Sequence, residues 1–275
     1  MKHQSPVSVG VVIPVYKSSL TDYEQIALKQ CMKVLGHYPI LLAAPDSLDI
    51  SLYQNLYPIL QVRRFDDRFF VDIQAYNKLM LSDVFYRAFT DLEYILIHQL
   101  DAFVFSDELT DWCQKGYDYI GAPWLRDRDY TGWGDEVWFR TKQRIALLID
   151  LKKPDGITPR EITSLNRVGN GGFSLRRVPA MLRWLRVFKG RIARYEKSHD
   201  YRYNEDIFWS VEVNRYLPLL RIPDYRTAMR FAIEFYPQRA VEQYNNGQLP
   251  FGCHAWDIHG TDYWRPIFAQ YGYQI

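Results

Sequence analysis

The chain of 275 residues has few cysteines and no excess of either charge. Its three cysteines, Cys31, Cys113 and Cys253, are widely spaced and form no CxxC pair, which argues against a disulfide framework and a structural zinc site. A reducing compartment is the simpler expectation. The 34 basic and 32 acidic residues leave a formal net charge of +2, so the overall charge gives no reason to expect nucleic acid as a partner.

The amino terminus lacks the marks of an export signal or a membrane span. Its apolar segment, VSVGVVIPVY, is interrupted by Pro14 and is followed by no small-residue cleavage pattern. Repeats of fixed period and low-complexity tracts are absent as well. We therefore expect a cytoplasmic protein, and its length suits a single α/β domain over residues 1–275.

Short apolar strands alternate with amphipathic helices in the first half of the chain. Because right-handed crossovers join neighbouring parallel strands, this alternation predicts an open, mostly parallel sheet flanked by helices. Ligands of such sheets bind beyond the carboxyl ends of the strands. The expected strands are 9–16, 38–45, 95–105 and 117–123. The expected helices are 22–36, with Gly36 as the C-terminal stop, and 75–89.

The pattern weakens between residues 124 and 159 into a charged segment rich in aromatic residues. We expect its first part to form a long loop or lid, because long loops in compact domains are often functional. A plain surface insertion is the alternative.

The expected strand 95–105, ILIHQLDAFVF, carries a carboxylate among apolar residues. A buried carboxylate is costly unless it is paired, protonated or bound to a cation, so Asp101 needs a partner. Its position near the end of a strand is where a ligand of a parallel sheet would lie. A ligand or cation is one candidate partner. The alternatives are that Asp101 caps a turn or pairs with Arg63, Arg64 or Arg68.

Three further motifs carry groups that a plain core does not need. GNGGFSLR, 169–176, has three glycines in four positions, which either let the backbone approach a ligand closely or mark a bulge. In NEDIFW, 204–209, two adjacent carboxylates open a helix-like run, either for chemistry or as first-turn acids that complement the helix dipole. FGCHAWDIHG, 251–260, holds two histidines among aromatic residues.

Taken in order, these motifs resemble glycosyltransferases of the A-type fold, which transfer a sugar from a nucleotide donor. The similarity includes YNKLMLSDVFYRAF and YILIHQLDAFVFSDELTDWCQKGYDYIGAPW and covers roughly residues 8 to 265. The match that can be named is a family of uncharacterised bacterial and fungal proteins of this fold. The resemblance implies a nucleotide-binding half at about 8–105 and a half for donor sugar and acceptor at about 106–275.

The resemblance also implies a metal site. Asp101 matches the last aspartate of the Asp-any-Asp motif of that fold, whereas Gln99 replaces the usual first aspartate and gives less negative charge to a cation. His254 matches the carboxy-terminal histidine that completes coordination, although a core histidine is the alternative. One carboxylate, one imidazole and two diphosphate oxygens suit Mn²⁺ or Mg²⁺. His259 follows the matched segment and is expected to be a bystander.

Other roles follow from the same resemblance. Asp206 occupies the position of the catalytic base in inverting members, and Glu205 is expected to orient the acceptor or the base. Lys78 is expected to approach the diphosphate. Tryptophans in the 124–159 segment either stack on sugar rings or anchor packing; they are Trp124, Trp133 and Trp138. The expected donor-binding residues are Pro14, Val15, Tyr16, Lys78, Gln99, Gly171 and Gly172.

The stretch 176–197 contains eight basic residues and the single acid Glu196, with apolar residues at helical spacing. We expect a basic amphipathic helix. One interpretation is peripheral contact with anionic lipid at the inner face of a membrane, as a lipid-linked saccharide acceptor would suit. The other is a surface helix whose apolar stripe packs on the sheet.

The sequence as a whole predicts an inverting, metal-assisted hexosyltransferase that moves a sugar from a UDP-sugar to a glycan hydroxyl in polysaccharide biosynthesis. A catalytically silent protein that binds sugar or nucleotide on the same fold is one rival, and the presence of Asp206 argues against it. A nucleotidyltransferase is the other. It would carry a glycine-rich phosphate loop after its first strand, and PVYKSSLTD contains no glycine.

Overall fold

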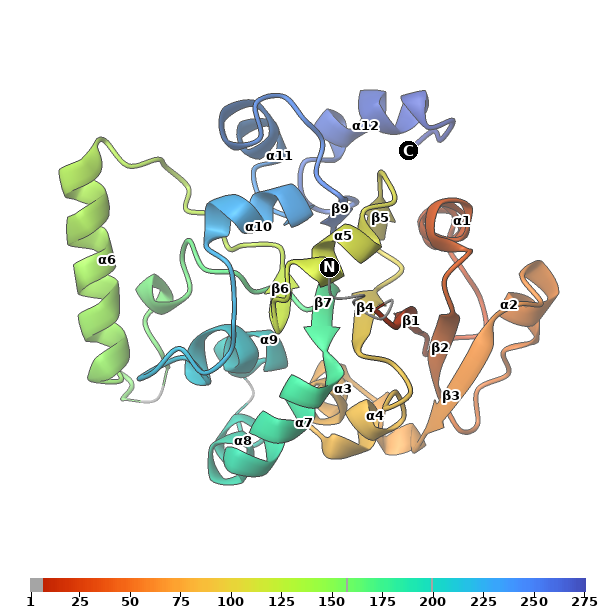
Figure 1. Cartoon of the computed structure of the whole chain (residues 1–275), viewed down its shortest axis with the longest axis horizontal. Coiled ribbons are helices and arrows are strands. Elements are labelled where there is room, and N and C mark those ends of the chain that lie inside the picture. Colours follow the sequence, from red (N-terminus) through yellow and green to blue (C-terminus); the bar gives the residue numbers. More distant parts are fainter. Residues whose placement is uncertain (1–6, 157, 199) are drawn as a thin grey trace, which may run out of the picture.

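The structure, a computed structural model, describes residues 7–156, 158–198 and 200–275. At its centre is a sheet made of β1 (Val9–Pro14), β2 (Ile40–Pro45), β3 (Gln61–Phe65), β4 (Tyr94–His98), β6 (Tyr119–Gly121) and β7 (Phe173–Arg177). The strand order is β3-β2-β1-β4-β7-β6 (Figure 1). The first four strands are parallel, whereas β7 runs antiparallel to both β4 and β6. The predicted open, mostly parallel sheet is therefore confirmed.

The first crossover helix, α1 (Asp22–Leu35), begins where the sequence supplies a reciprocal cap. The Thr21 hydroxyl accepts from the Glu24 backbone N–H at 3.3 Å, and the Glu24 carboxylate accepts from the Thr21 N–H at 2.8 Å. Gly36 ends the helix, as expected. This cap satisfies N–H groups that the first helical turn leaves without partners.

Both faces of the sheet are buried, because successive side chains of its central strands enter different cores. In β1, Val11 and Ile13 belong to one core cluster and Val12 to the other. Helices α1 and α5 (Leu109–Gln114) contribute to the first cluster. Figure 1 shows several helices of the second cluster together below the sheet, namely α3 (Ile73–Met80), α4 (Asp83–Arg87), α7 (Val178–Val187) and α8 (Lys189–Tyr195).

The expected single strand 95–105 is wrong, because it divides into two strands of different sheets. After β4 the chain turns at residues 99–101, where Gln99 N–H donates to the Gly172 carbonyl at 2.8 Å. The following strand, β5 (Ala102–Val104), begins a second sheet of order β5-β9-β8, with β9 (Gly252–His254) and β8 (Ala232–Ile233). Asp101 thus lies in the turn between two sheets and not within a strand.

Two other expected elements are also divided. The predicted helix 75–89 is α3 and α4, because Ser82 caps a new helix by accepting from the Phe85 N–H at 3.3 Å. The first part of the 124–159 segment is a loop, but α6 (Trp133–Leu148) follows it and stands at the left of Figure 1.

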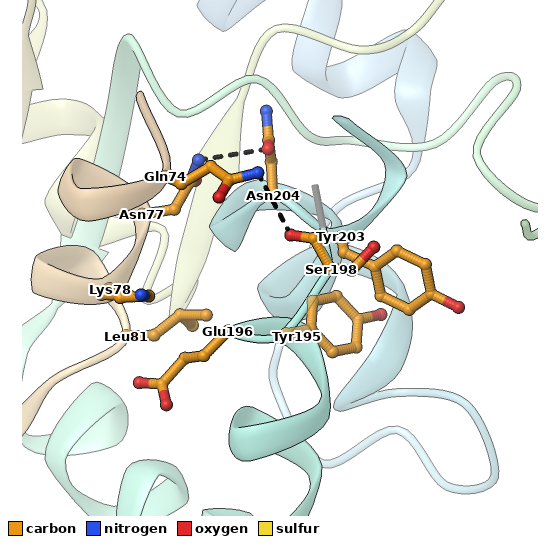
Figure 2. A pocket seen from close by; sticks show the side chains of 9 residues that line it. All are labelled: Gln74, Asn77, Lys78, Leu81, Tyr195, Glu196, Ser198, Tyr203 and Asn204. Atoms are coloured by element: carbon orange, nitrogen blue, oxygen red, sulfur yellow. Dashed lines mark hydrogen bonds between the residues drawn. The ribbon is translucent and has the colours of Figure 1, made fainter. Parts of the chain in front are cut away.

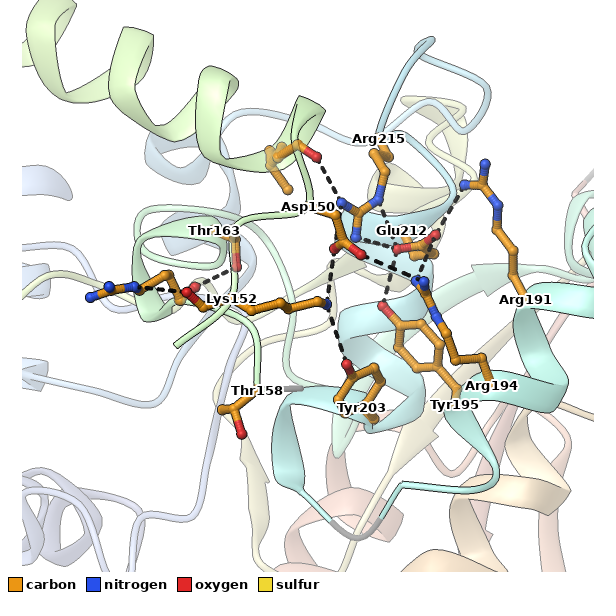
Figure 3. A network of polar contacts seen from close by, with 12 residues as sticks. Asp150, Lys152, Thr158, Thr163, Arg191, Arg194, Tyr195, Tyr203, Glu212 and Arg215 are labelled. Atoms are coloured by element: carbon orange, nitrogen blue, oxygen red, sulfur yellow. Dashed lines mark hydrogen bonds and ion pairs between the residues drawn. The ribbon is translucent and has the colours of Figure 1, made fainter. Parts of the chain in front are cut away.

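The single basic helix expected over 176–197 is wrong as well. This stretch forms the end of β7 and then α7 and α8, which meet at Phe188. Its charge is partly neutralised, because Arg191 and Arg194 lie 3.0 and 3.5 Å from the buried Glu212 carboxylate (Figure 3). Glu212 also pairs with Arg215.

Further helices and short turns complete the described part of the chain. The helices are α2 (Ser51–Leu56), α9 (Glu205–Ile207), α10 (Tyr225–Phe231), α11 (Pro237–Arg239) and α12 (Thr261–Gln270), and the short 3₁₀ and π turns are η1 (Asp67–Phe69), η2 (Glu161–Thr163), η3 (Tyr201–Tyr203), η4 (Phe208–Glu212) and η5 (Ala240–Tyr244). All three cysteines are free and buried. Within the described ranges, every helix is too short or too polar to span a bilayer.

Candidate active site

A cavity of about 790 Å³ opens beyond the carboxyl ends of β1 and β4. Its volume lies in the range of pockets that hold small-molecule ligands. Because β7 is antiparallel to β4, its first residue, Phe173, pairs with the last residue of β4, His98. The glycine-rich turn before β7 and the Asp101 turn after β4 therefore meet at the same edge of the sheet.

Most of the residues that the sequence singled out line this cavity. Lys78 does not: its exposed side chain borders a separate hollow beside Tyr195 and Glu196 (Figure 2). The same helix, α3, instead turns Tyr76 and Asn77 toward the cavity. The predicted residues that line the cavity are Pro14, Val15, Tyr16, Gln99, Asp101, Gly171, Gly172, Glu205, Asp206 and His254.

Sheet register brings His254 to Asp101. His254 pairs with Ala102 across β9 and β5, which leaves its ring beside the turn that precedes β5. Its Nε2 lies 3.2 Å from Asp101 Oδ1 and 3.2 Å from Gln99 Oε1. The distance to Asp101 is that of an ion pair, and the buried Oδ1 atom accepts no well-directed hydrogen bond from a described residue. Three polar atoms thus converge on one point of the cavity wall.

The arginines considered as partners of Asp101 are engaged elsewhere. Arg63 lies 3.5 Å from Asp91, and Arg68 lies 3.4 Å from Asp66. Arg64 donates to the backbone carbonyls of Pro45 and Leu48. The alternative in which an arginine neutralises Asp101 is therefore wrong.

The pairing changes the titration of both groups. Burial opposes the charged form of His254, but the Asp101 carboxylate and, behind the ring, the Glu234 carboxylate outweigh it and raise the His254 pKa to about 10. Burial likewise opposes ionisation of Asp101, yet the His254 charge holds its pKa below the ordinary value. His98, which is buried against Phe173, behaves oppositely, because burial lowers its pKa to about 4.

The glycine turn packs directly against these groups. A Cβ atom on Gly172 would collide with His254 Nε2, and one on Gly171 would collide with the Glu205 carboxylate. The Asn170 side chain closes the turn by accepting from the Gly172 N–H at 2.9 Å. These positions are therefore glycine because side chains of the site occupy the space a Cβ would need, which a simple bulge would not require.

Glu205 is anchored below the cavity by a buried arginine. Arg176 of β7 donates to both Glu205 carboxylate oxygens, at 2.8 and 2.9 Å. It also donates to the Tyr86 hydroxyl at 2.9 Å and the Ser174 hydroxyl at 3.0 Å, and its side chain is fully buried. A bidentate pair of this kind fixes the orientation of the carboxylate. Glu205 thus makes its hydrogen bonds inside the protein, and its expected role of orienting the acceptor or the base stays a prediction.

Asn77 clamps the start of α9 onto α3. Its side-chain N–H donates to Asn204 Oδ1 at 3.1 Å (Figure 2), and its side-chain oxygen accepts from the Glu205 N–H at 2.9 Å. The start of α9 is therefore held by α3 through Asn77 and by β7 through the bond from Arg176 to the Glu205 side chain. This clamp sets where the next side chain, Asp206, enters the cavity.

Asp206 has the most strongly altered acidity among the cavity carboxylates. Burial is the main cause, the nearby Glu205 charge adds to it, and the pKa rises to about 7. The Ile207 N–H donates to Asp206 Oδ1 at 2.7 Å and opposes the rise only in part. Asp206 therefore exchanges its proton near neutral pH, as a general acid or base must.

Sequence reasoning missed Arg176, Asn170 and Glu234. The sequence predicts Arg176 as part of a basic surface helix. In a strand, however, Arg176 alternates with Phe173 and Leu175, which could have indicated that it lies on the opposite face of the sheet from them. Asn170 was overlooked between conspicuous glycines. No local pattern marks Glu234, which reaches the site only through the second sheet.

Of the three tryptophans singled out in the sequence, Trp124 has a packing position. Trp124 lies against Gly169, where a Cβ would collide with its ring. Trp133 and Trp138 lie on α6 with 82% and 59% of their surface exposed, and neither lines the cavity. Sugar stacking by these three residues has no support in the geometry.

The atoms around His254 fit a divalent cation that shares its coordination with a ligand. Among the described residues, no three His, Cys, Asp or Glu side chains cluster as a complete metal site. Asp101 and His254 are two such groups, Gln99 adds an amide oxygen, and the buried Asp101 oxygen accepts no directed hydrogen bond from any residue that the structure describes. Diphosphate oxygens would complete the set, and this mixture of donors suits Mn²⁺ or Mg²⁺.

Similar solved structures identify the fold. Mouse xyloside xylosyltransferase 1 in its apo form superposes with a TM-score of 0.50 at 11% identity, over 90% of this chain and 98% of that one. The galactosyltransferase LgtC, solved with donor and acceptor sugar analogues, gives a TM-score of 0.51 at 13% identity, over 89% of this chain and 86% of that one. At these identities the likeness establishes the fold, which is the A-type fold of nucleotide-sugar glycosyltransferases.

Within that fold class, the chain belongs to a protein family of unknown function, DUF5672, whose family model matches residues 59–254. The matched region runs from just before β3 to His254 and so includes the Asp101 turn, the glycine turn and α9. No curated protein matches the chain in sequence.

Proposed function

We propose that this protein transfers a sugar from a nucleoside-diphosphate donor to a hydroxyl group of a saccharide. The proposal rests on one observation: a single cavity at the carboxyl ends of parallel strands gathers Asp101, His254, the glycine turn and a carboxylate, Asp206, whose pKa lies near 7. Relatives of the same fold include a xylosyltransferase and a galactosyltransferase, which supports a glycosyl transfer.

In this proposal the donor diphosphate binds beside Asp101, His254 and Gln99. These residues would hold Mn²⁺ or Mg²⁺, which neutralises charge on the departing diphosphate when bound. The donor sugar would lie along Gly171 and Gly172. The half of the cavity that Pro14, Val15 and Tyr16 line would receive the nucleobase, and Tyr16, with 64% of its surface exposed, offers a ring for stacking. A UDP-sugar is the donor we expect.

Asp206 acts as the general base in the proposed reaction. It takes the proton of the acceptor hydroxyl as the oxygen attacks the anomeric carbon, while the sugar–phosphate bond breaks and its electron pair leaves with the diphosphate. Attack opposite the leaving group inverts the anomeric configuration. The Glu205–Arg176 pair acts through Asp206, because it fixes the backbone before Asp206. The Glu205 charge raises the Asp206 pKa, and the Arg176 charge offsets part of that rise.

The acceptor we propose is a glycan, and contact with an anionic membrane would bring a lipid-linked acceptor to the cavity. In the basic stretch 176–197, Arg191 and Arg194 pair with Glu212. The other exposed cations of this stretch, which would contact the membrane, are Arg183, Arg186, Lys189 and Lys197. Sedimentation with anionic vesicles at low and physiological salt tests this contact, and absence of binding at both refutes it.

A thermal-shift screen of nucleotide sugars, with and without Mn²⁺, tests the proposed donor. A ligand that binds the native state raises the melting temperature, and the rise should require both Mn²⁺ and Asp101. A silent binding protein would show the same shift but release no nucleoside diphosphate when an acceptor is added. No shift with any nucleotide sugar would refute the proposal.

A nucleotidyltransferase receives no support from the geometry after β1. The first turn of α1 carries Asp22 and Glu24, whose charges disfavour a phosphate at that helix start. Analysis of the released product separates the two reactions. A glycosyltransferase would release a nucleoside diphosphate from a nucleotide sugar, whereas a nucleotidyltransferase would release pyrophosphate from a nucleoside triphosphate.

A further inference from the structure

Glu234 lies behind the cavity wall and connects Asn170 of the glycine turn with His254. It directly follows β8 and is 7% exposed. One of its carboxylate oxygens accepts a hydrogen bond from the Asn170 side-chain N–H. The other lies 3.7 Å from His254 Nδ1. A single carboxylate therefore faces both the glycine turn and the histidine beside Asp101.

The two nitrogens of the His254 ring face different surroundings. Nε2 points at the oxygen atoms of Asp101 and Gln99, both 3.2 Å away. Nδ1 is buried and makes no directed hydrogen bond within the described part of the chain, and the Glu234 carboxylate is the acidic group that faces it. An imidazole that binds a cation through one nitrogen carries its proton on the other, where an acceptor usually holds it.

We propose that Glu234 is a positioning residue that holds the His254 proton on Nδ1 and so leaves the Nε2 lone pair free to bind a cation beside Asp101. The same carboxylate fixes Asn170, whose side-chain oxygen holds the Gly172 N–H at 2.9 Å. Glu234 thereby fixes the position of the His254 ring relative to the glycine turn. This inference rests on the proposed function, because it takes His254 as a ligand of the donor-bound cation.

Two acceptor oxygens are needed for this role. The Asn170 N–H and the His254 Nδ1–H are both donors, and a glutamate offers an oxygen to each. A glutamine of the same shape offers one oxygen and one NH₂ group. Glu234→Gln therefore leaves one of the two donors facing another donor, while the volume of the side chain is preserved.

The test measures Mn²⁺ binding in the presence of UDP, together with the magnetic coupling between Mn²⁺ and an imidazole nitrogen detected by pulsed electron paramagnetic resonance. Loss of such an orienting partner typically weakens metal binding about 10- to 100-fold. We expect that loss in Glu234→Gln, with the nitrogen coupling lost or shifted. Glu234→Asp, which withdraws the carboxylate by one methylene, should weaken binding less and shift the coupling.

Asp257→Asn is the matched control. Asp257 lines the same cavity and interacts electrostatically with both Asp101 and His254, but its side chain makes no ion pair or hydrogen bond with His254 Nδ1 in the described part of the chain. This variant removes one negative charge near the site, and its Mn²⁺ affinity should stay within about threefold of wild type with the coupling intact.

Several results would overturn the inference. They are unchanged Mn²⁺ affinity in both Glu234 variants, an equal loss in Asp257→Asn, or a loss with the nitrogen coupling unchanged. Circular dichroism identifies a variant that fails to fold, in which case the Glu234→Asp result decides. A wild-type protein that transfers sugar but shows no imidazole coupling also refutes the role of Glu234, while the proposed transfer itself stands.

Discussion

Asp206→Asn should make the protein more stable and less active, and the gain in stability should depend on pH. The folded-state pKa of Asp206 is about 7, against 3.8 for an ordinary aspartate. Between these values the native carboxyl keeps a proton that the unfolded chain has released. Stability therefore falls as the pH rises from about 4 to 7, and it stays reduced above that range. Asparagine does not titrate, so the variant avoids this loss.

The size of the effect follows from the shift. A difference of about three pKa units corresponds to ~4 kcal/mol at pH 8, which is an upper limit because Asp206 borders a water-accessible cavity. At pH 5 the carboxyl is protonated in the native state, and the gain should be smaller by up to ~3 kcal/mol. Urea unfolding at both pH values measures the difference.

Asp262→Asn is the control for a carboxylate-to-amide change, since the Asp262 side chain is 94% exposed. It should alter the free energy of unfolding by less than about 0.5 kcal/mol at either pH. In Asp206→Asn, kcat for sugar transfer should fall by about 10² to 10⁴, with donor affinity nearly unchanged. A stability gain that is the same at pH 5 and pH 8, or a loss at pH 8, would refute the reasoning about Asp206.

Three further predictions concern the rest of the site. Gly172→Ala should displace His254 and so weaken Mn²⁺-dependent donor binding at least about tenfold, as measured by calorimetry. Gly190→Ala is the control, because a Cβ there has open space, and it should leave the affinity unchanged. Equal affinities of the two variants would contradict the packing argument. Arg176→Met should lower the free energy of unfolding by about 3 to 5 kcal/mol, because it leaves the buried Glu205 carboxylate without its cation; urea titration measures the loss. The exposed Arg183→Met is the control, and an equally small loss in both variants would show that the Arg176–Glu205 pair does not stabilise the fold. Product NMR should reveal an inverted anomeric configuration, and retention would refute the single displacement.

The alternation of strands and helices was predictable because it depends on local patterns. Val11, Ile13 and their neighbours form a continuous apolar run that only a strand buried on both faces requires, and Thr21 with Glu24 marks the helix that follows. The break after His98 was not predictable in the same way. The apolar pattern continues through it, and the turn is set by a hydrogen bond from Gln99 to Gly172, more than seventy residues away.

The site was predictable where a residue type conflicts with its local surroundings. Asp101 within an apolar segment and His254 among aromatic residues both stood out, and the structure places them 3.2 Å apart. Arg176 did not stand out, because it begins the basic stretch 176–197. Only the strand register of β7 distinguishes an arginine buried beneath the cavity from one on the surface. Glu234 depends entirely on tertiary contacts.

The most direct test of the account compares wild type, Asp101→Ala and Asp206→Asn with one nucleotide sugar found by the thermal-shift screen. Calorimetry measures donor binding with Mn²⁺, and mass spectrometry detects the glycosylated acceptor. The account predicts that wild type binds and transfers, that Asp206→Asn binds without transferring, and that Asp101→Ala does neither. Transfer by Asp101→Ala at the wild-type rate would contradict it.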